Sequence, residues 1–189
     1  MHADEGMWLF NRLPAERLEE RYGFKPSESW AEHIMRSSVR ISAGGSGSIV
    51  SPRGLVLTNH HVVSSWVEEL SSAERNLMEN GFAARTHEEE LKLPGAEILV
   101  LQEIVDVTDR VRAVAEASSD PAESEKARRV EIAAIEKESK EATGLHSEVV
   151  TLYRGGEFHL YRYRRYDDVR LVFVPESKIA FFGGDADNF

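Results

Sequence analysis

Between residues 39 and 63, short apolar runs alternate with glycine-rich turns, and this alternation limits the fold more than any other feature of the sequence. The runs are Val39 to Ile41, Ser48 to Val50 and Leu55 to Leu57. The turns between them are Gly44-Gly45-Ser46-Gly47 and Pro52-Arg53-Gly54. Apolar runs of a few residues bounded by glycine and proline are typical of antiparallel strands. We therefore expect three short strands joined by tight turns.

Helices are expected on both sides of these strands. Gly23 suits the end of a helix, and Ser29 with Glu32 forms a capping-box pattern, so two short helices should precede residue 38. Ser71 with Glu74 repeats the capping-box pattern. A further helix is therefore predicted after the adjacent histidines at positions 60 and 61.

The second half of the chain is predicted to contain a helical insertion followed by more strands. Residues 108–143 are charged and alanine-rich, with Glu125 and Arg129 four residues apart, and Gly144 follows them. An apolar run at Ile98 to Leu101 predicts a buried strand before the insertion. Strand patterns resume after it at 148–154, 157–164, 169–174 and 178–182. Gly155-Gly156 predicts a two-residue hairpin turn between the first two.

Strand patterns on both sides of a helical insertion favour one interrupted β domain over alternating βαβ units. The predicted fold class is therefore mainly β with helical segments. Within a single domain over residues 1–189, we expect a helical amino-terminal segment at 1–37, strands at 38–107 and 147–189, and the insertion at 108–146.

Composition narrows the partners of the chain. The formal net charge of -10 disfavours nucleic acid, because phosphate binding depends on lysine and arginine. The sequence has no cysteine, which excludes disulfides and thiolate metal sites. No apolar run approaches the ~18 residues of a membrane span, and residues 1–6 do not resemble a leader peptide. The protein is therefore expected to be cytosolic or to have lost its leader.

The chemically informative segment is Leu57-Thr58-Asn59-His60-His61-Val62-Val63, where a strand ends in a polar cluster. A general base needs a fixed direction and open access, which this position offers. The segment resembles the histidine region of chymotrypsin-fold serine peptidases, in which two residues separate a Leu-Thr strand end from the catalytic histidine. The resemblance assigns His61 as catalytic base and His60 as a structural neighbour. Metal binding is not expected, since no His-Glu-x-x-His pair is present.

Two peptidase families of this fold fit the histidine segment. The high-temperature-requirement endopeptidases carry a similar Ser-Pro-x-Gly and Leu-Thr-Asn-x-His-Val-Val run. The rest of the chain is similar to the bacterial dipeptidyl-peptidase 7 and 11 family. The motifs that carry this second resemblance are Asp4 to Trp8, Leu13-Pro14, Tyr22 to Phe24, Ser37 to Arg40, Gly81 to Ala84, Glu89 to Gly95, Asp106 to Val111 and Phe181 to Phe189.

The second resemblance implies the incomplete first β-barrel of a chymotrypsin-like double barrel, with amino-terminal helices and a helical insertion. It implies a periplasmic, cell-surface or secreted serine dipeptidyl aminopeptidase that acts on oligopeptides without a cofactor. Asn188 and Phe189 match the family's asparagine and aromatic residue that bind the amino terminus of the substrate. The triad aspartate and serine are expected beyond this chain, so the fragment alone should be inactive. A homodimer is one expectation for the full-length protein.

Some residues also fit other functions. Ser46 and Ser48 are expected to form turns rather than to act as nucleophiles. Val62 stands where the family often has a cysteine, and the pair Val62-Val63 is what a high-temperature-requirement endopeptidase would carry. The alternatives are therefore that endopeptidase and a non-catalytic peptide-binding module on a protease fold.

Overall fold

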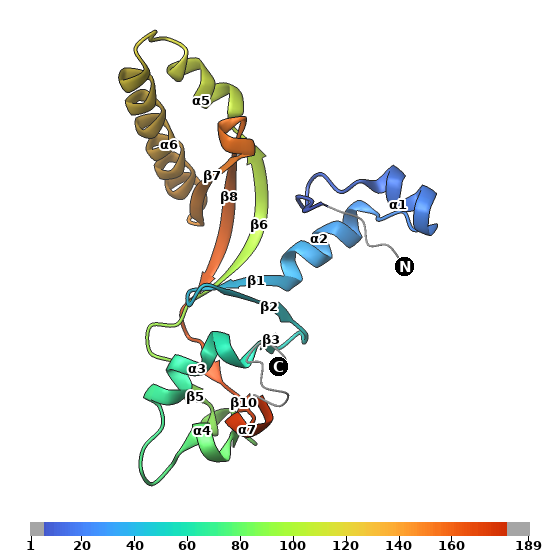
Figure 1. Cartoon of the computed structure of the whole chain (residues 1–189), viewed down its shortest axis with the longest axis vertical. Coiled ribbons are helices and arrows are strands. Elements are labelled where there is room, and N and C mark those ends of the chain that lie inside the picture. Colours follow the sequence, from blue (N-terminus) through green and yellow to red (C-terminus); the bar gives the residue numbers. More distant parts are fainter. Residues whose placement is uncertain (1–5, 181–189) are drawn as a thin grey trace. The chain divides into compact units, whose positions relative to one another are not determined.

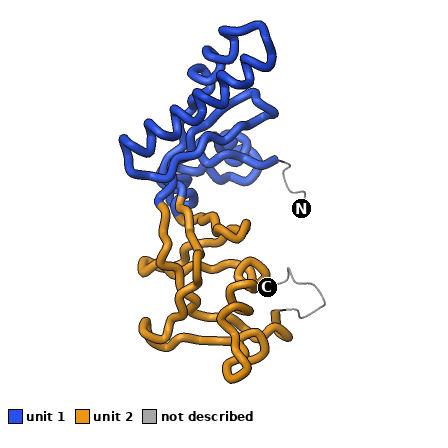
Figure 2. The backbone as a smooth tube through the Cα atoms, turned by 90° about the vertical axis from the view of Figure 1, so that its left-hand side faces the viewer, with its two compact units in different colours: residues 1–36, 101–164 blue, residues 37–100, 165–189 orange. Residues whose placement is uncertain are grey.

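The computed structural model describes residues 6–180, and the chain divides into two compact units (Figure 2). Unit 1 combines residues 1–36 with 101–164, and unit 2 combines residues 37–100 with 165–189. Unit 2 contains the strands that lead to His61. The residues between 37 and 100 therefore form most of the framework of the candidate site.

The strands of unit 2 form an antiparallel sheet. In chain order they are β1 (Ser38–Ile41), β2 (Gly45–Ile49), β3 (Val56–Thr58) and the first residues of β6 (Ile98–Asp106). Their order in the sheet is β3-β2-β1-β6 (Figure 1). Gly47 lies opposite both Val39 on β1 and Thr58 on β3. The three short strands expected from the glycine-rich turns are therefore present, with their register defined.

The rest of unit 2 consists of short elements. The first group is α3 (His60–Glu69), α4 (Leu77–Asn80), β4 (Phe82–Ala83), η1 (His87–Glu89) and β5 (Leu91–Lys92). The second group is β9 (Arg170–Leu171), β10 (Phe173–Val174) and α7 (Ser177–Ala180). β10 pairs with β4, and β9 pairs with β5. The chain therefore returns after residue 169 to lie beside residues 82–92.

Two hydrophobic clusters hold unit 2 together. Val39, Ile41 and Val100 form the core under the sheet, and Val62 packs against it. The second cluster lies beneath α3 and its members are Val67, Leu77, Leu93, Ala96, Leu171 and Val174. Trp66 packs against both clusters. α3 is therefore in contact with both parts of the core of unit 2.

Unit 1 consists of helices and three strands that belong to the six-stranded sheet. Its helical elements are α1 (Ala15–Tyr22), α2 (Glu28–Ser37), α5 (Thr108–Ala115), α6 (Pro121–Thr143) and η2 (Tyr153–Gly155). Its strands are the remainder of β6, β7 (His146–Leu152) and most of β8 (Glu157–Tyr166), in the order β6-β8-β7. The core consists of Val111, Ile135, Phe158 and Leu160.

Local capping explains the extent of α6. The Asp120 carboxylate accepts a hydrogen bond from the Ala122 N–H at 2.9 Å, Pro121 occupies the first turn, and Gly144 ends the helix with φ of 69°. α5 and α6 fill the segment in which the helical insertion was predicted. In the part of the chain that the structure describes, no helix is long and apolar enough to cross a membrane.

Several local predictions were wrong. Residues 178–182 were predicted as a strand, but the described part of this segment lies in the helix α7 (Ser177–Ala180). No helix starts at Ser71: α3 already begins at His60, and the Ser71 hydroxyl donates to the Val67 carbonyl at 2.7 Å and accepts from the Leu77 N–H at 3.0 Å. Ser71 therefore joins the end of α3 to the start of α4. The β7–β8 connection is longer than two residues, since Leu152 lies opposite Glu157 and residues 153–156 form the turn.

Candidate active site

His61 lies where β3 passes into α3. Asn59 precedes the helix with extended backbone angles, φ −79° and ψ 149°, and the Val62 N–H donates to the Asn59 carbonyl at 3.1 Å. The Ser64 hydroxyl donates to the His61 carbonyl at 3.0 Å. The side chain of His61 is exposed. Its backbone is therefore fixed by the first turn of a helix while its imidazole is accessible to solvent.

A cavity of about 370 Å³ lies beside His61. The residues that line it are Gly44, Gly45, Ser46, Asn59, His61 and Val62. They come from two segments: Gly44 and the first residues of β2 on one side, and the junction of β3 with α3 on the other. The Thr58 hydroxyl ties these segments together by donating to the Ser46 carbonyl at 2.7 Å. The cavity therefore has a wall of glycine backbone opposite an imidazole.

His60 and His61 have different environments. His60 is 6% exposed, whereas His61 is exposed. Burial, and after it the charge of His61, lowers the pKa of His60 below its ordinary value. Of the two imidazoles, His61 is the one that a substrate can reach.

α3 is held from behind by Trp66 and Val67. The Trp66 indole N–H donates to the Pro94 carbonyl at 2.9 Å. Val67 is fully buried among the apolar residues beneath the helix. These contacts fix the helix that carries His61 at its amino-terminal end.

A second group of titratable residues lies in unit 1. His159 is fully buried, and its Nε2 lies 3.0 Å from Glu157 Oε2 and 3.6 Å from Asp106 Oδ2. The Arg12 guanidinium bonds the same two carboxylates, at 2.6 Å for Glu157 and 3.3 Å for Asp106. Arg12 therefore fastens the amino-terminal segment to β6 and β8.

The neighbours of the two carboxylates lower their pKa values. For Asp106 the largest cause is its hydrogen bonding to Thr108, and for Glu157 it is the hydrogen bond from Arg12. Asp106, Glu157 and His159 lie close enough together to hold a metal ion. The Arg12 guanidinium already brings a positive charge to both carboxylates, so this group fits an internal ion pair better than a metal centre.

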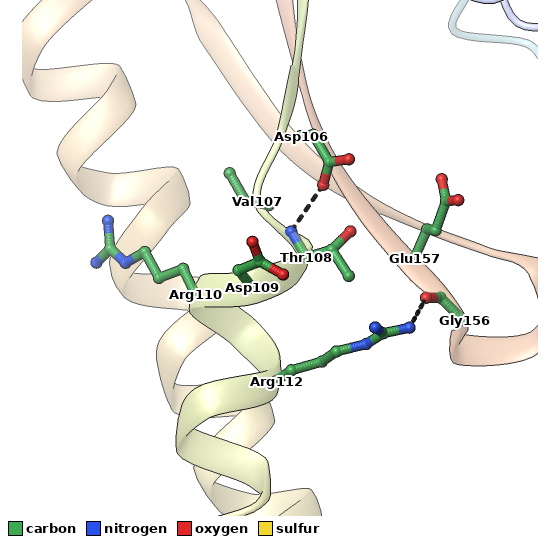
Figure 3. A pocket seen from close by; sticks show the side chains of 8 residues that line it. All are labelled: Asp106, Val107, Thr108, Asp109, Arg110, Arg112, Gly156 and Glu157. Carbon is green, nitrogen blue, oxygen red and sulfur yellow. Dashed lines mark hydrogen bonds between the residues drawn. The ribbon is translucent and has the colours of Figure 1, made fainter.

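A larger cavity of about 610 Å³ opens beside this group (Figure 3). Figure 3 shows Arg110 pointing toward α6, where its guanidinium bonds Glu131 at 2.5 Å and Glu138 at 2.7 Å. Arg112 donates to the Gly156 carbonyl. Both arginines of the cavity are therefore engaged in contacts that join elements of unit 1.

The predicted site residues have different outcomes. His61 lies on the cavity, and its role as base stays a prediction. Asn188 and Phe189 lie outside the described residues. Ser46 and Ser48 were expected in turns, but both lie on the paired strand β2, and Ser46 also lines the cavity. The group around Arg12 was not predicted: Glu157 and His159 share a strand face two residues apart, but nothing local in the sequence points to Arg12.

Comparison with known proteins places the chain among peptidases. The family model described as Peptidase S46 matches residues 3–189. Dipeptidyl-peptidase 7 of Porphyromonas endodontalis is 35% identical over 196 residues, which cover 99% of this chain and 24% of that protein. The Asp/Glu-specific dipeptidyl-peptidase of Porphyromonas gingivalis is 34% identical and covers 100% of this chain and 28% of that protein. The chain therefore spans about a quarter of the length of these curated relatives.

A solved structure shows the same arrangement. The crystal structure of Porphyromonas endodontalis DPP11 in complex with the dipeptide Arg-Glu matches with a TM-score of 0.79 and 28% sequence identity. The match covers 98% of this chain and 28% of the DPP11 chain. It confirms the predicted fold class, a partial chymotrypsin-like fold with additional helices. The predicted division into segments within one domain stays a prediction.

Proposed function

Because the chain belongs to the Peptidase S46 family, we propose that it is the amino-terminal part of the catalytic domain of a serine dipeptidyl-peptidase. The observation that carries this proposal is His61, exposed on a cavity at the junction of β3 and α3. The relatives supply the reaction class, since both named above are dipeptidyl-peptidases. The substrates proposed are oligopeptides with a free amino terminus.

In this proposal His61 transfers the protons of the reaction. It accepts the proton of a serine hydroxyl as that oxygen attacks the peptide carbonyl, and it then donates the proton to the departing amine. Its exposed side chain meets the need for access, and the packed α3 helix meets the need for a fixed direction. The serine and the aspartate of the triad are expected in the part of the full-length protein that this chain does not span.

Asn188 and Phe189 are proposed to bind the amino terminus of the substrate. An ammonium group has three donors and no acceptor, so the amide oxygen of Asn188 can accept a hydrogen bond from it. An aromatic face beside the ammonium adds a cation–π attraction of about 0.5–2 kcal/mol. Binding the terminus in this way limits cleavage to a set distance from it, which is what release of dipeptides requires.

Two features of the full-length protein are proposed from the family resemblance. We place it in the periplasm or at the cell surface, where oligopeptides from outside the cell arrive. No cofactor is needed for the chemistry, because the triad itself supplies the nucleophile and the base. Preference for an acidic or an apolar side chain is not part of the proposal, since relatives of both names match at similar identity.

Matched oligopeptides with free and acetylated amino termini test the proposal on the full-length protein. Mass spectrometry of the products should show dipeptides from the free peptide and almost none from the acetylated one. Asn188→Ala should raise KM for the free peptide, whereas Asn80→Ala, an exposed position at the end of α4, should not.

The alternatives give different products. A high-temperature-requirement endopeptidase would cleave both peptides internally at similar rates. A non-catalytic binding module would bind the free peptide and release nothing. Either result would overturn the dipeptidyl-peptidase proposal.

A further inference from the structure

Strand β2 begins with a glycine, and the side chain of the residue after His61 occupies the space that a side chain on this glycine would need. Gly45 is the first residue of β2, and Val62 directly follows His61. A Cβ atom placed on Gly45 would lie 2.4 Å from Val62 Cγ1, 2.5 Å from Cγ2 and 3.1 Å from Cβ. Contacts below 3.0 Å are essentially absent from real Cβ atoms. Any other residue at position 45 therefore requires Val62 to move.

Val62 has little freedom to move by itself. Both of its methyl groups lie against the position of the added atom, so rotating the side chain exchanges one clash for another. A β-branched side chain in a helix also has one strongly preferred rotamer. The side chain of Val62 also packs against the buried cluster of Val39, Ile41 and Val100. The strain would therefore pass to the backbone at the start of α3.

The position of β2 is fixed because the strand pairs with a neighbour on each side. Gly45 lies opposite Ile41 on β1, and Gly47 lies opposite Thr58 on β3. The Thr58 hydroxyl also holds the Ser46 carbonyl at 2.7 Å. Relief of a clash at position 45 therefore moves the first turn of α3, which contains His61, relative to the wall of the cavity.

Backbone conformation does not explain a glycine here. Gly45 is not among the described glycines with positive φ, and it lies in a paired strand, where alanine is accommodated. The requirement at position 45 is therefore steric, and it depends on the size of residue 62.

From these contacts we propose that Gly45 is a positioning residue for His61, which it sets in place through Val62. The proposal rests on the proposed peptidase function, because it assigns Gly45 a part in that reaction. Gly45 contributes no chemical group. It allows the β1–β2 turn and the start of α3 to approach closely enough that the imidazole lies on the cavity.

The test measures dipeptide release by the full-length enzyme and four variants: Gly45→Ala, Val62→Ala, the double variant of both, and Ser48→Ala. Ser48 is exposed on the same strand and does not line the cavity, so Ser48→Ala should retain activity and is the matched control. Displacing a catalytic group by about 1 Å costs ~100-fold in rate, so Gly45→Ala should lower kcat by about that factor with little change in KM.

Rescue separates positioning from a general effect on folding. Val62→Ala removes both clashing methyl groups, so the double variant should recover the kcat of Val62→Ala alone. Thermal unfolding followed by circular dichroism checks that each variant is folded. If Gly45→Ala does not fold, the double variant decides the matter, since it should be both folded and active.

The outcomes also separate this inference from the proposed function. No dipeptide release by the unaltered enzyme defeats the proposed function. Release by the unaltered enzyme together with full activity of Gly45→Ala overturns only the role of Gly45. A double variant that fails to fold, or that is as impaired as a folded Gly45→Ala, overturns it as well.

Discussion

Replacing Val67 with alanine tests whether α3, and with it His61, is held by the core of unit 2. Val67 is fully buried in the cluster that contains Leu77 and Leu93. The change removes two methyl groups, which costs about 1.6 kcal/mol at ~0.8 kcal/mol for each buried group. The cavity left behind adds to this cost, so α3 should lose ~2–3 kcal/mol of local stability.

Hydrogen–deuterium exchange of the full-length protein, read by mass spectrometry, measures this loss at the amides of residues 60–69. A factor of ten corresponds to 1.36 kcal/mol, so a loss of ~2.5 kcal/mol speeds exchange by about 70-fold. Val130→Ala is the matched control, because it removes the same groups from α6 at a side chain that is 64% exposed. Its effect should stay within ~0.5 kcal/mol. Equal effects of the two substitutions would refute the packing argument.

Two further predictions concern one contact within unit 1 and one contact within unit 2. The hydrogen bond from Arg12 is the largest cause that lowers the pKa of Glu157 in the folded protein, so this bond stabilises the fold fully above the ordinary carboxyl pKa of about 4 and less as the pH falls through the lowered value. The difference in thermal midpoint between the unaltered protein and Arg12→Gln should therefore be present at pH 7 and shrink as the pH falls below about 4, and a constant difference would contradict this. Trp66→Phe removes the hydrogen bond to the Pro94 carbonyl, so urea unfolding should show a loss of about 1 kcal/mol, and an unchanged midpoint would show that the bond is unimportant.

The parts of the fold that follow local rules were predictable from the sequence. The three short strands at residues 38–58 follow from the apolar runs, although residues 45–47, which were expected in a turn, form the start of β2. The helix at residues 121–143 is marked at both ends, by Asp120-Pro121 and by Gly144. Local capping and turn chemistry are sufficient in these cases.

Where tertiary contacts decide, the sequence was a poorer guide. Ser71 has the pattern of a helix cap, yet its hydroxyl joins two helices through Val67 and Leu77. Arg12 lies 145 residues from its partner Glu157, and no periodicity links them. Spacing in the sequence was enough to single out His61. The contact between Gly45 on β2 and Val62 on α3 has no local signal in the sequence and is visible only in the structure.

The most direct test of the account is the activity of His61→Ala in the full-length protein. With a dipeptidyl substrate at pH 7, kcat/KM should fall by at least ~10⁴-fold, because the serine loses its base and the departing amine its acid. His33→Ala, at an exposed position on α2, should retain the unaltered rate. A His61→Ala enzyme that is as active as His33→Ala would contradict the assignment of His61 as the catalytic base.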